Sequence, residues 1–145
     1  MSSIEEVFAP VDGSESSIRA ARVAATLASS LAVPLTLGFV IPLTAESAMA
    51  LSKLDRERIE SLQRERAESV LVGVREQVAE AGVEAPATEV RLGDPAEEIL
   101  RSLDARPGAM VVIGRRGLST LQGLLIGSVS DKVVRHARNP VTIVN

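Results

Sequence analysis

The most informative stretch of this chain is Gly114-Arg115-Arg116-Gly117, followed after nine further residues by Gly127-Ser128-Val129-Ser130. It begins where the apolar run Ala109–Ile113 ends, and it finishes where a helical pattern, Val129–Arg138, begins. Glycines let a backbone turn with a positive φ and approach a ligand closely. The first turn of a helix offers N–H groups without intrahelical partners and the positive end of the helix dipole. A phosphate-binding loop is therefore predicted at this junction.

Glycines that merely shape a long loop are the alternative interpretation of this stretch. Three glycines and two serines at a single junction between a strand and a helix favour a ligand over that alternative. Arg115 and Arg116 are candidate phosphate partners, because guanidinium groups bind phosphate with paired hydrogen bonds. Exposed surface positions remain the alternative for both arginines.

Outward from this loop, apolar runs typical of strands alternate with patterns typical of helices. The predicted strands are residues 7–11, 34–40, 88–92, 109–113 and 141–144, and the predicted helices are 18–28, 44–81, 96–103 and 129–138. Such alternation implies an α/β fold with a parallel sheet and helices on both of its faces. No composition shift or linker interrupts the pattern, so we expect one domain over residues 1–145.

Local signals mark the ends of several elements. Ser14 and Asp94 are expected to cap the helices that follow them, and Pro95 is suited to a first helical position. Gly82 is expected to end the long second helix, whose charged centre predicts a solvated face. Pro10 fits a buried strand only at the strand's end.

Ala9-Pro10-Val11-Asp12-Gly13-Ser14 forms a second candidate site at the end of the first predicted strand. An Asp at such a position can accept hydrogen bonds from a ribose hydroxyl or an exocyclic amine. The alternative is an Asp that only shapes the turn. Ligands of parallel sheets bind beyond the carboxyl ends of the strands. Asp12, Val40 and Gly114 all follow such ends, which favours the ligand role for Asp12.

Other nucleotide and catalytic motifs do not match this sequence. The loop lacks the Gly-x-x-x-x-Gly-Lys-Ser/Thr order of a Walker A motif, and its glycines are too widely spaced for a dinucleotide fingerprint. Lys132 lies about one helical turn from the predicted phosphate end and is expected at the surface. His136, the sole histidine, is expected to complement the helix dipole rather than to act in catalysis. No His or carboxylate spacing predicts a metal site.

Composition limits the partners. The net charge of −3 argues against a general binder of nucleic acid or of anionic membranes. No apolar run approaches the ~20 residues that span a bilayer, and no signal peptide is recognisable, so a cytoplasmic location is expected. Cysteine, Trp and Tyr are absent and there are only two Phe, so a bound base must be held by backbone and aliphatic groups rather than by stacking.

The chain resembles the universal stress protein family, of the single-domain ATP-binding kind. That family's signature of Gly, two residues, Gly, nine residues, Gly and then Ser or Thr is present as Gly114, Gly117, Gly127 and Ser128. The flanking segments Val111–Gly114, Gly127–Ala137 and Asn139–Val141 match as well. Pro10–Ser14 and Arg91–Pro95 resemble the family's first and third strand ends. The resemblance spans the whole chain and is weakest between Thr44 and Pro86.

The resemblance implies a three-layer α/β/α fold, Rossmann-like and of the adenine nucleotide alpha hydrolase type, with five parallel strands in order 3-2-1-4-5. It also implies a homodimer through the last strand, Val141–Val144. The implied ligand is ATP, AMP or ADP, with Mg²⁺ or Mn²⁺ bound mainly by the phosphates. The residues implied to bind this nucleotide are Pro10, Val11, Asp12, Val40, Gly114, Arg116, Gly117, Gly127, Ser128, Val129 and Ser130.

Three functions compete at this point. A nucleotide-dependent regulatory or stress-response protein is the expected one, with a protein partner that the sequence does not name. A slow ATPase or autophosphorylating enzyme is the alternative, although no dedicated base lies near the loop in the sequence. A nucleotide-free scaffold is the third, and the intact glycine signature argues against it.

Overall fold

A computed structural model describes residues 3–43, 52–117 and 126–145. The five strands are β1 (Glu6–Pro10), β2 (Leu35–Pro42), β3 (Ala87–Gly93), β4 (Ala109–Gly114) and β5 (Val141–Val144). The helices of the described residues are α1 (Glu15–Leu31), α3 (Lys53–Glu80), α4 (Pro95–Asp104) and α5 (Ser128–His136). All pairs of neighbouring strands are parallel, and the strand order is β3-β2-β1-β4-β5. The predicted α/β class and strand order are confirmed.

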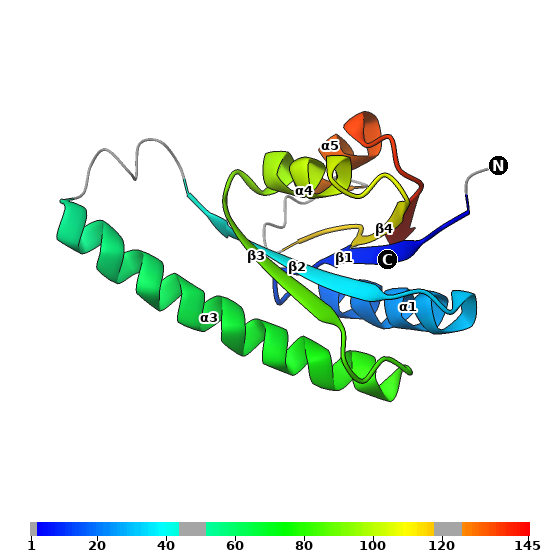
Figure 1. Cartoon of the computed structure of the whole chain (residues 1–145). Coiled ribbons are helices and arrows are strands. Elements are labelled where there is room, and N and C mark those ends of the chain that lie inside the picture. The colour runs from blue at the N-terminus through cyan, green and yellow to red at the C-terminus, as the bar shows by residue number, and fades with distance from the viewer. Residues whose placement is uncertain (1–2, 44–51, 118–125) are drawn as a thin grey trace.

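The sheet lies between two helical layers, with α1 and α3 on one face and α4 and α5 on the other (Figure 1). Strand residues alternate between the layers, as a pleated strand requires. Val7 and Ala9 pack on the α1–α3 side, whereas Phe8 packs with Ile99 of α4 and Val133 of α5. Residues of β1 and β4 are buried almost throughout, which agrees with their continuous apolar sequences.

The predicted local signals hold at the ends of the elements. Ser14 caps α1 by accepting from Ser17 N, and Asp94 caps α4 by accepting from Glu97 N, with Pro95 in the first turn. Gly82 follows the end of α3 with a φ of 112°, a conformation that favours glycine. Pro10 is the last residue of β1, where a missing N–H removes no bond inside the ladder.

Some predicted boundaries shift. β3 is longer than expected by one residue at each end, because it pairs with β2 over the full length Ala87–Gly93. α5 ends at His136 rather than Arg138, since Ala137 is already extended with a ψ of 138°. Asn139 fixes that exit by donating from Nδ2 to Arg106 O and Ala109 O at 2.8 and 3.0 Å. The predicted helix over 44–81 is described only from Lys53, and its first part lies outside the described residues.

Helix α3 projects beyond the sheet at its N-terminal end (Figure 1). Its buried residues are Ala67, Leu71, Val74 and Val78, which all lie in its second half. The first half is rich in Lys, Arg, Asp and Glu and is largely exposed, as the sequence predicts for a solvated face. Throughout the described residues, no helix combines the length and the apolar character that crossing a membrane requires.

A network of charges stabilises the β1–β2–β3 part of the sheet on the α4 side. Glu89 of β3 accepts from Arg91 Nε at 2.8 Å, from Ser102 Oγ at 3.1 Å and from Arg106 Nη1 at 3.1 Å. Arg106 also pairs with Glu6 at 3.3 Å and lies over the ring of Phe8, 5.2 Å from its centroid. Burial raises the pKa of Glu89, but the hydrogen bonds from Arg91 and Ser102 and the charges of Arg106 and Arg91 together lower it below its ordinary value.

Candidate functional site

A cavity of about 270 Å³ opens at the carboxyl ends of β1, β2 and β4, beside the first turns of α4 and α5. This is where strand order reverses in a doubly wound sheet, and where such folds bind ligands. It is lined by Pro10, Val11, Asp12, Ser17, Val40, Pro42, Pro95, Ile99, Ile113, Gly114, Arg116, Gly117, Ser128, Val129 and Ser130. All the residues predicted from sequence except Gly127 and the candidate Arg115 therefore line one cavity.

The cavity has two chemically different parts. Its walls near β2 and α4 are aliphatic, formed by side chains such as Val40, Pro42 and Ile99. Its other part is polar, with Asp12, Arg116 and the first turn of α5. An apolar wall joined to a few convergent polar groups is typical of a small-molecule site. This arrangement suits a ligand with a flat apolar end and an anionic end.

Asp12 is oriented by its own turn. Its Oδ1 accepts a hydrogen bond from Ser14 N at 2.9 Å, and its backbone N–H donates to Ser17 Oγ at 3.3 Å. The turn-shaping interpretation of Asp12 is therefore correct as far as Oδ1 is concerned. The other oxygen, Oδ2, lies beside Gly117: a Cβ built on Gly117 would approach it to 2.6 Å. A side chain at position 117 would therefore force the Asp12 carboxylate to shift.

The first turn of α5 differs from those of the other helices. Its N-cap is Gly127, which has no side chain, and no side-chain hydrogen bond caps the helix among the described residues. The hydroxyl of Ser130 donates to Gly114 O at 2.6 Å and is buried, so this proton is used inside the protein. The groups that this turn offers to an anion are therefore backbone N–H groups and the exposed Ser128.

Gly127 itself does not line the cavity. It closes the glycine loop: its N–H donates to Arg115 O at 2.6 Å, and its carbonyl accepts from Asp131 N at 2.9 Å. A Cβ there would lie 3.3 Å from Arg115 O and 3.4 Å from Arg116 Cα. The space left by the missing side chain of Gly127 is thus occupied by the backbone of residues 115–117.

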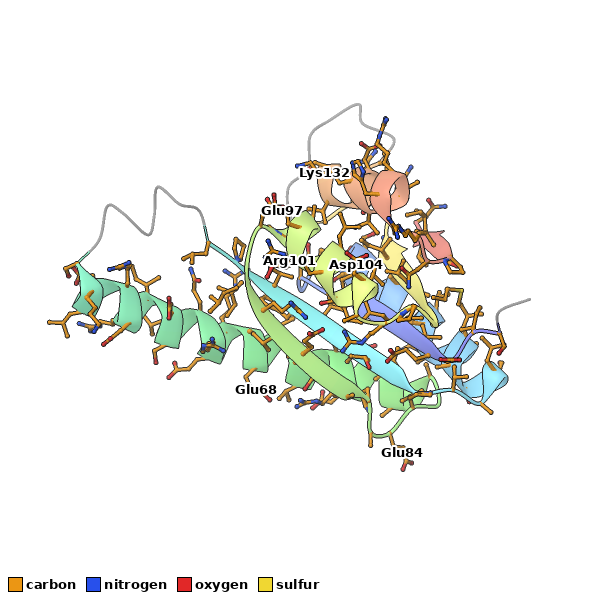
Figure 2. The ribbon with its side chains drawn as sticks, turned by 45° about the horizontal axis from the view of Figure 1, so that its top comes forward. Glu68, Glu84, Glu97, Arg101, Asp104 and Lys132 are labelled. Carbon is orange, nitrogen blue, oxygen red and sulfur yellow. The ribbon has the colours of Figure 1, made fainter. Side chains whose placement is uncertain are left out.

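The two arginines of the loop differ in their relation to the cavity. Arg116 lines the cavity and is half-buried, whereas Arg115 does not line it and joins the end of β5 through Arg115 N and Val144 O at 2.7 Å. Lys132 is exposed on α5, as predicted, and His136 is exposed in the last turn of α5, where a role at the helix dipole is predicted; neither lines the cavity. Figure 2 shows Lys132 on α5, whereas Glu97, Arg101 and Asp104 lie on α4. In the described residues, no group of three or more His, Cys, Asp or Glu side chains could hold a metal ion.

Several lining residues are not among those predicted from the sequence: Ser17, Pro42, Pro95, Ile99 and Ile113. Ser17 and Pro95 belong to the first turns of α1 and α4, which the strand-end argument does not cover. Ile99 is an ordinary apolar helix residue in sequence, and it reaches the cavity because α4 packs across β2. For Pro42, its position at the end of a predicted strand is a signal from which the sequence could have predicted that it lines the cavity.

Comparison with known proteins gives a consistent result. The family model for the universal stress protein family matches residues 4–145. Universal stress protein YxiE of Bacillus subtilis is 39% identical over 75 residues, which are 52% of this chain and 50% of that protein. The chain spans about half the length of the curated relatives that it matches.

Solved structures share the fold. Universal stress protein UspA from Lactobacillus plantarum has a TM-score of 0.81 at 21% identity, with 100% of each chain covered. A universal stress protein in complex with cAMP has a TM-score of 0.74 at 24% identity, covering 99% of this chain and 98% of that one. The universal stress protein from Archaeoglobus fulgidus in complex with dAMP has a TM-score of 0.63 at 21% identity, with 100% of each chain covered. With its family model matched from residue 4 to residue 145, this chain belongs to the universal stress protein family.

Proposed function

We propose that this protein binds an adenine nucleotide and acts as a nucleotide-dependent regulatory protein of the stress response. The observation that carries the proposal is the cavity itself, in which aliphatic walls meet the first turn of α5, a turn without a side-chain cap. A nucleotide has the matching halves, a flat base and an anionic phosphate. The cAMP and dAMP complexes of two structural neighbours support the same class of ligand.

In this proposal, the base and ribose contact Pro10, Val11, Asp12 and Val40 at the ends of β1 and β2. With no aromatic residue among the lining side chains, the base is held by aliphatic contacts and backbone groups. Asp12 accepts a hydrogen bond from the ribose or from the exocyclic amine. The adenine ring is thus selected by shape and hydrogen bonds rather than by stacking.

The phosphates contact the glycine loop and the first turn of α5 in this proposal. These residues are Gly114, Arg116, Gly117, Ser128, Val129 and Ser130, whereas Gly127 acts by closing the loop through its bond to Arg115 O. Backbone N–H groups and the helix dipole attract the anion, and Arg116 adds a positive charge. Ser130 contributes through its backbone, because its hydroxyl already donates to Gly114 O. Mg²⁺ or Mn²⁺ would be bound mainly by the phosphates of ATP.

We further propose a cytoplasmic homodimer that pairs β5 with its copy. β5 is an edge of the sheet, and an edge strand offers unpaired N–H and C=O groups to another chain. A two-fold axis would close this pairing without creating a new edge.

Two measurements test the nucleotide proposal. Mass spectrometry after native and then denaturing elution identifies any adenine nucleotide that the purified protein carries. Calorimetric titration with ATP, ADP, AMP, cAMP and adenosine, with and without Mg²⁺, ranks the ligands. We expect binding of at least one adenine nucleotide, tighter than that of adenosine. A protein that elutes without nucleotide and shows no heat with any of the five ligands would contradict the proposal. Steady release of phosphate from ATP that the protein does bind would identify the slow ATPase instead.

A further inference from the structure

We propose that Ser17 is a positioning residue of the nucleotide site, because its hydroxyl fixes the backbone of Asp12 and thereby directs the Asp12 carboxylate. The inference rests on the nucleotide-binding function proposed above. Ser17 lies in the first turn of α1, borders the cavity, and is 5% exposed. Its role is distinct from that of the residues that contact the ligand.

The hydroxyl of Ser17 makes two hydrogen bonds within the protein. It donates to Ser14 O at 2.9 Å and accepts from Asp12 N at 3.3 Å. A hydroxyl has one proton, so while Ser14 O accepts it, Ser17 cannot donate to a ligand. A bond from a helical serine to a carbonyl three residues earlier is common, and it explains the contact with Ser14. It does not explain the contact with Asp12, which lies outside any helix or strand.

Asp12 needs this support because it lies in the short connection between β1 and α1. Two hydrogen bonds contribute to its orientation: Ser17 accepts from its N–H, and its Oδ1 accepts from Ser14 N at 2.9 Å. The second bond holds the side chain relative to the backbone, and the first holds the backbone relative to α1. Loss of the Ser17 hydroxyl would remove the bond that holds the Asp12 N–H to α1 and leave the side-chain turn intact. The Asp12 carboxylate would then be held less firmly relative to Gly117 and the cavity.

The neighbouring Ser16 shows that this turn of α1 supports both halves of the site. Ser16 Oγ accepts from Arg116 N at 3.5 Å, and a Cβ on Gly114 would lie 2.6 Å from the same oxygen. Ser16 therefore packs against the end of β4, while Ser17 holds the end of β1. The first turn of α1 thus joins the two strand ends that the proposal assigns to the phosphates and to the nucleoside.

A double-mutant cycle between Ser17 and Asp12 tests the proposal. Calorimetry with adenosine and with ATP is carried out on the wild type, Ser17→Ala, Asp12→Ala and the double variant. We expect Ser17→Ala to weaken both ligands about fivefold, the size of one hydrogen bond, and to add nothing once Asp12 is alanine. Ser17→Thr keeps the hydroxyl and should bind within about twofold of the wild type. Thr26→Ala is the matched control: it removes a hydroxyl that donates to Arg22 O on the exposed side of α1, away from the cavity.

Amide hydrogen exchange provides a readout that needs no ligand. Ser17→Ala should speed exchange of the Asp12 amide about fivefold, whereas the Val11 amide, which donates to Gly38 O at 2.8 Å, should keep its rate. Unchanged Asp12 exchange, or an affinity loss that persists in full in the Asp12→Ala background, would overturn the positioning role. So would wild-type affinity in Ser17→Ala. If the wild type itself binds neither ligand, the proposed function fails and the role of Ser17 fails with it. If the wild type binds and Ser17→Ala binds equally well, only the role of Ser17 fails.

Discussion

The hydroxyl of Ser130 donates a 2.6 Å hydrogen bond to the carbonyl oxygen of Gly114, so the first turn of α5 is tied directly to the end of β4. Both residues belong to the predicted phosphate-binding set, yet this bond is internal to the protein. It is buried and spans the whole glycine loop. The loop is thus closed at its two ends by the protein itself.

Ser130→Ala should therefore affect stability more than binding. It leaves the buried Gly114 carbonyl without this donor, and we expect a loss of about 1–3 kcal/mol in the free energy of unfolding. The backbone N–H of residue 130 remains, so ATP affinity should change by less than about threefold if that group is what contacts phosphate. Urea denaturation and calorimetry on the same samples separate the two effects. A large loss of affinity with unchanged stability would show that the hydroxyl contacts the ligand.

Gly127→Val should abolish ATP binding while the protein stays folded. The valine side chain would press on Arg115 O and Arg116 Cα and displace the backbone that forms the glycine loop. Gly73→Val is the matched control, since Gly73 lies in α3 with no atom within 4 Å of its built Cβ. Calorimetry measures affinity, and circular dichroism checks the fold. Equal ATP affinity in Gly127→Val and the wild type would contradict the phosphate-loop assignment.

Asp12→Ala should weaken nucleoside recognition by about 1–3 kcal/mol, the cost of losing a charged hydrogen-bond partner. The loss should be equal for adenosine and ATP, because the proposed contact lies at the base and ribose end. Titration of both ligands against the variant and the wild type measures it. A loss confined to ATP would move the action of Asp12 to the phosphates or their metal ion.

Glu89→Gln should change how stability depends on pH. The folded-state pKa of Glu89 is lowered, so its carboxylate stabilises the fold above its unfolded-state pKa, and that contribution is lost as pH falls through the folded-state value. At pH 7 the variant removes the carboxylate that pairs with Arg91 and one of the two carboxylates that pair with Arg106, and we expect a loss of about 1–3 kcal/mol in the free energy of unfolding. The difference between variant and wild type should shrink as the wild-type carboxyl is protonated. Urea denaturation at pH 7 and near pH 3 checks this, and a difference that grows toward acid would contradict it.

Ile143→Pro should dissociate the proposed homodimer and leave the chain folded. Val111 N donates to Pro140 O and Arg115 N donates to Val144 O. The backbone N–H and C=O groups of the even-numbered residues of β5 therefore point toward β4. In a parallel ladder this alternation turns the N–H of Ile143 outward, where proline would delete a donor from the free edge rather than from the sheet.

Sedimentation equilibrium at micromolar concentration measures the mass, and circular dichroism confirms folding. A wild-type mass of one chain would refute the dimer. An unchanged dimer in a folded Ile143→Pro variant would move its interface away from β5.

Much of this architecture could be predicted from local sequence patterns, which involve residues close together in the chain. The caps at Ser14 and Asp94, the strand-ending Pro10 and the glycine signature from Gly114 to Gly127 are recognisable without coordinates, because capping, turns and alternation depend on residues a few positions apart. The alternation predicts a parallel sheet, and the family resemblance predicts its strand order. The same reasoning places Asp12, Val40 and Gly114 at one edge.

Folding alone brings together groups that lie far apart in the chain. Arg116 N meets Ser16 Oγ across 100 positions, and Ser130 meets Gly114 across 16. No local pattern says that Ile99 reaches the cavity or that Glu89 pairs with Arg106, since each outcome depends on how α4 packs against the sheet. The residue types able to bind a nucleotide can thus be identified from the sequence alone. Which of their atoms already make hydrogen bonds within the protein depends on close packing between distant segments, because a hydrogen bond forms only when donor and acceptor are in near contact.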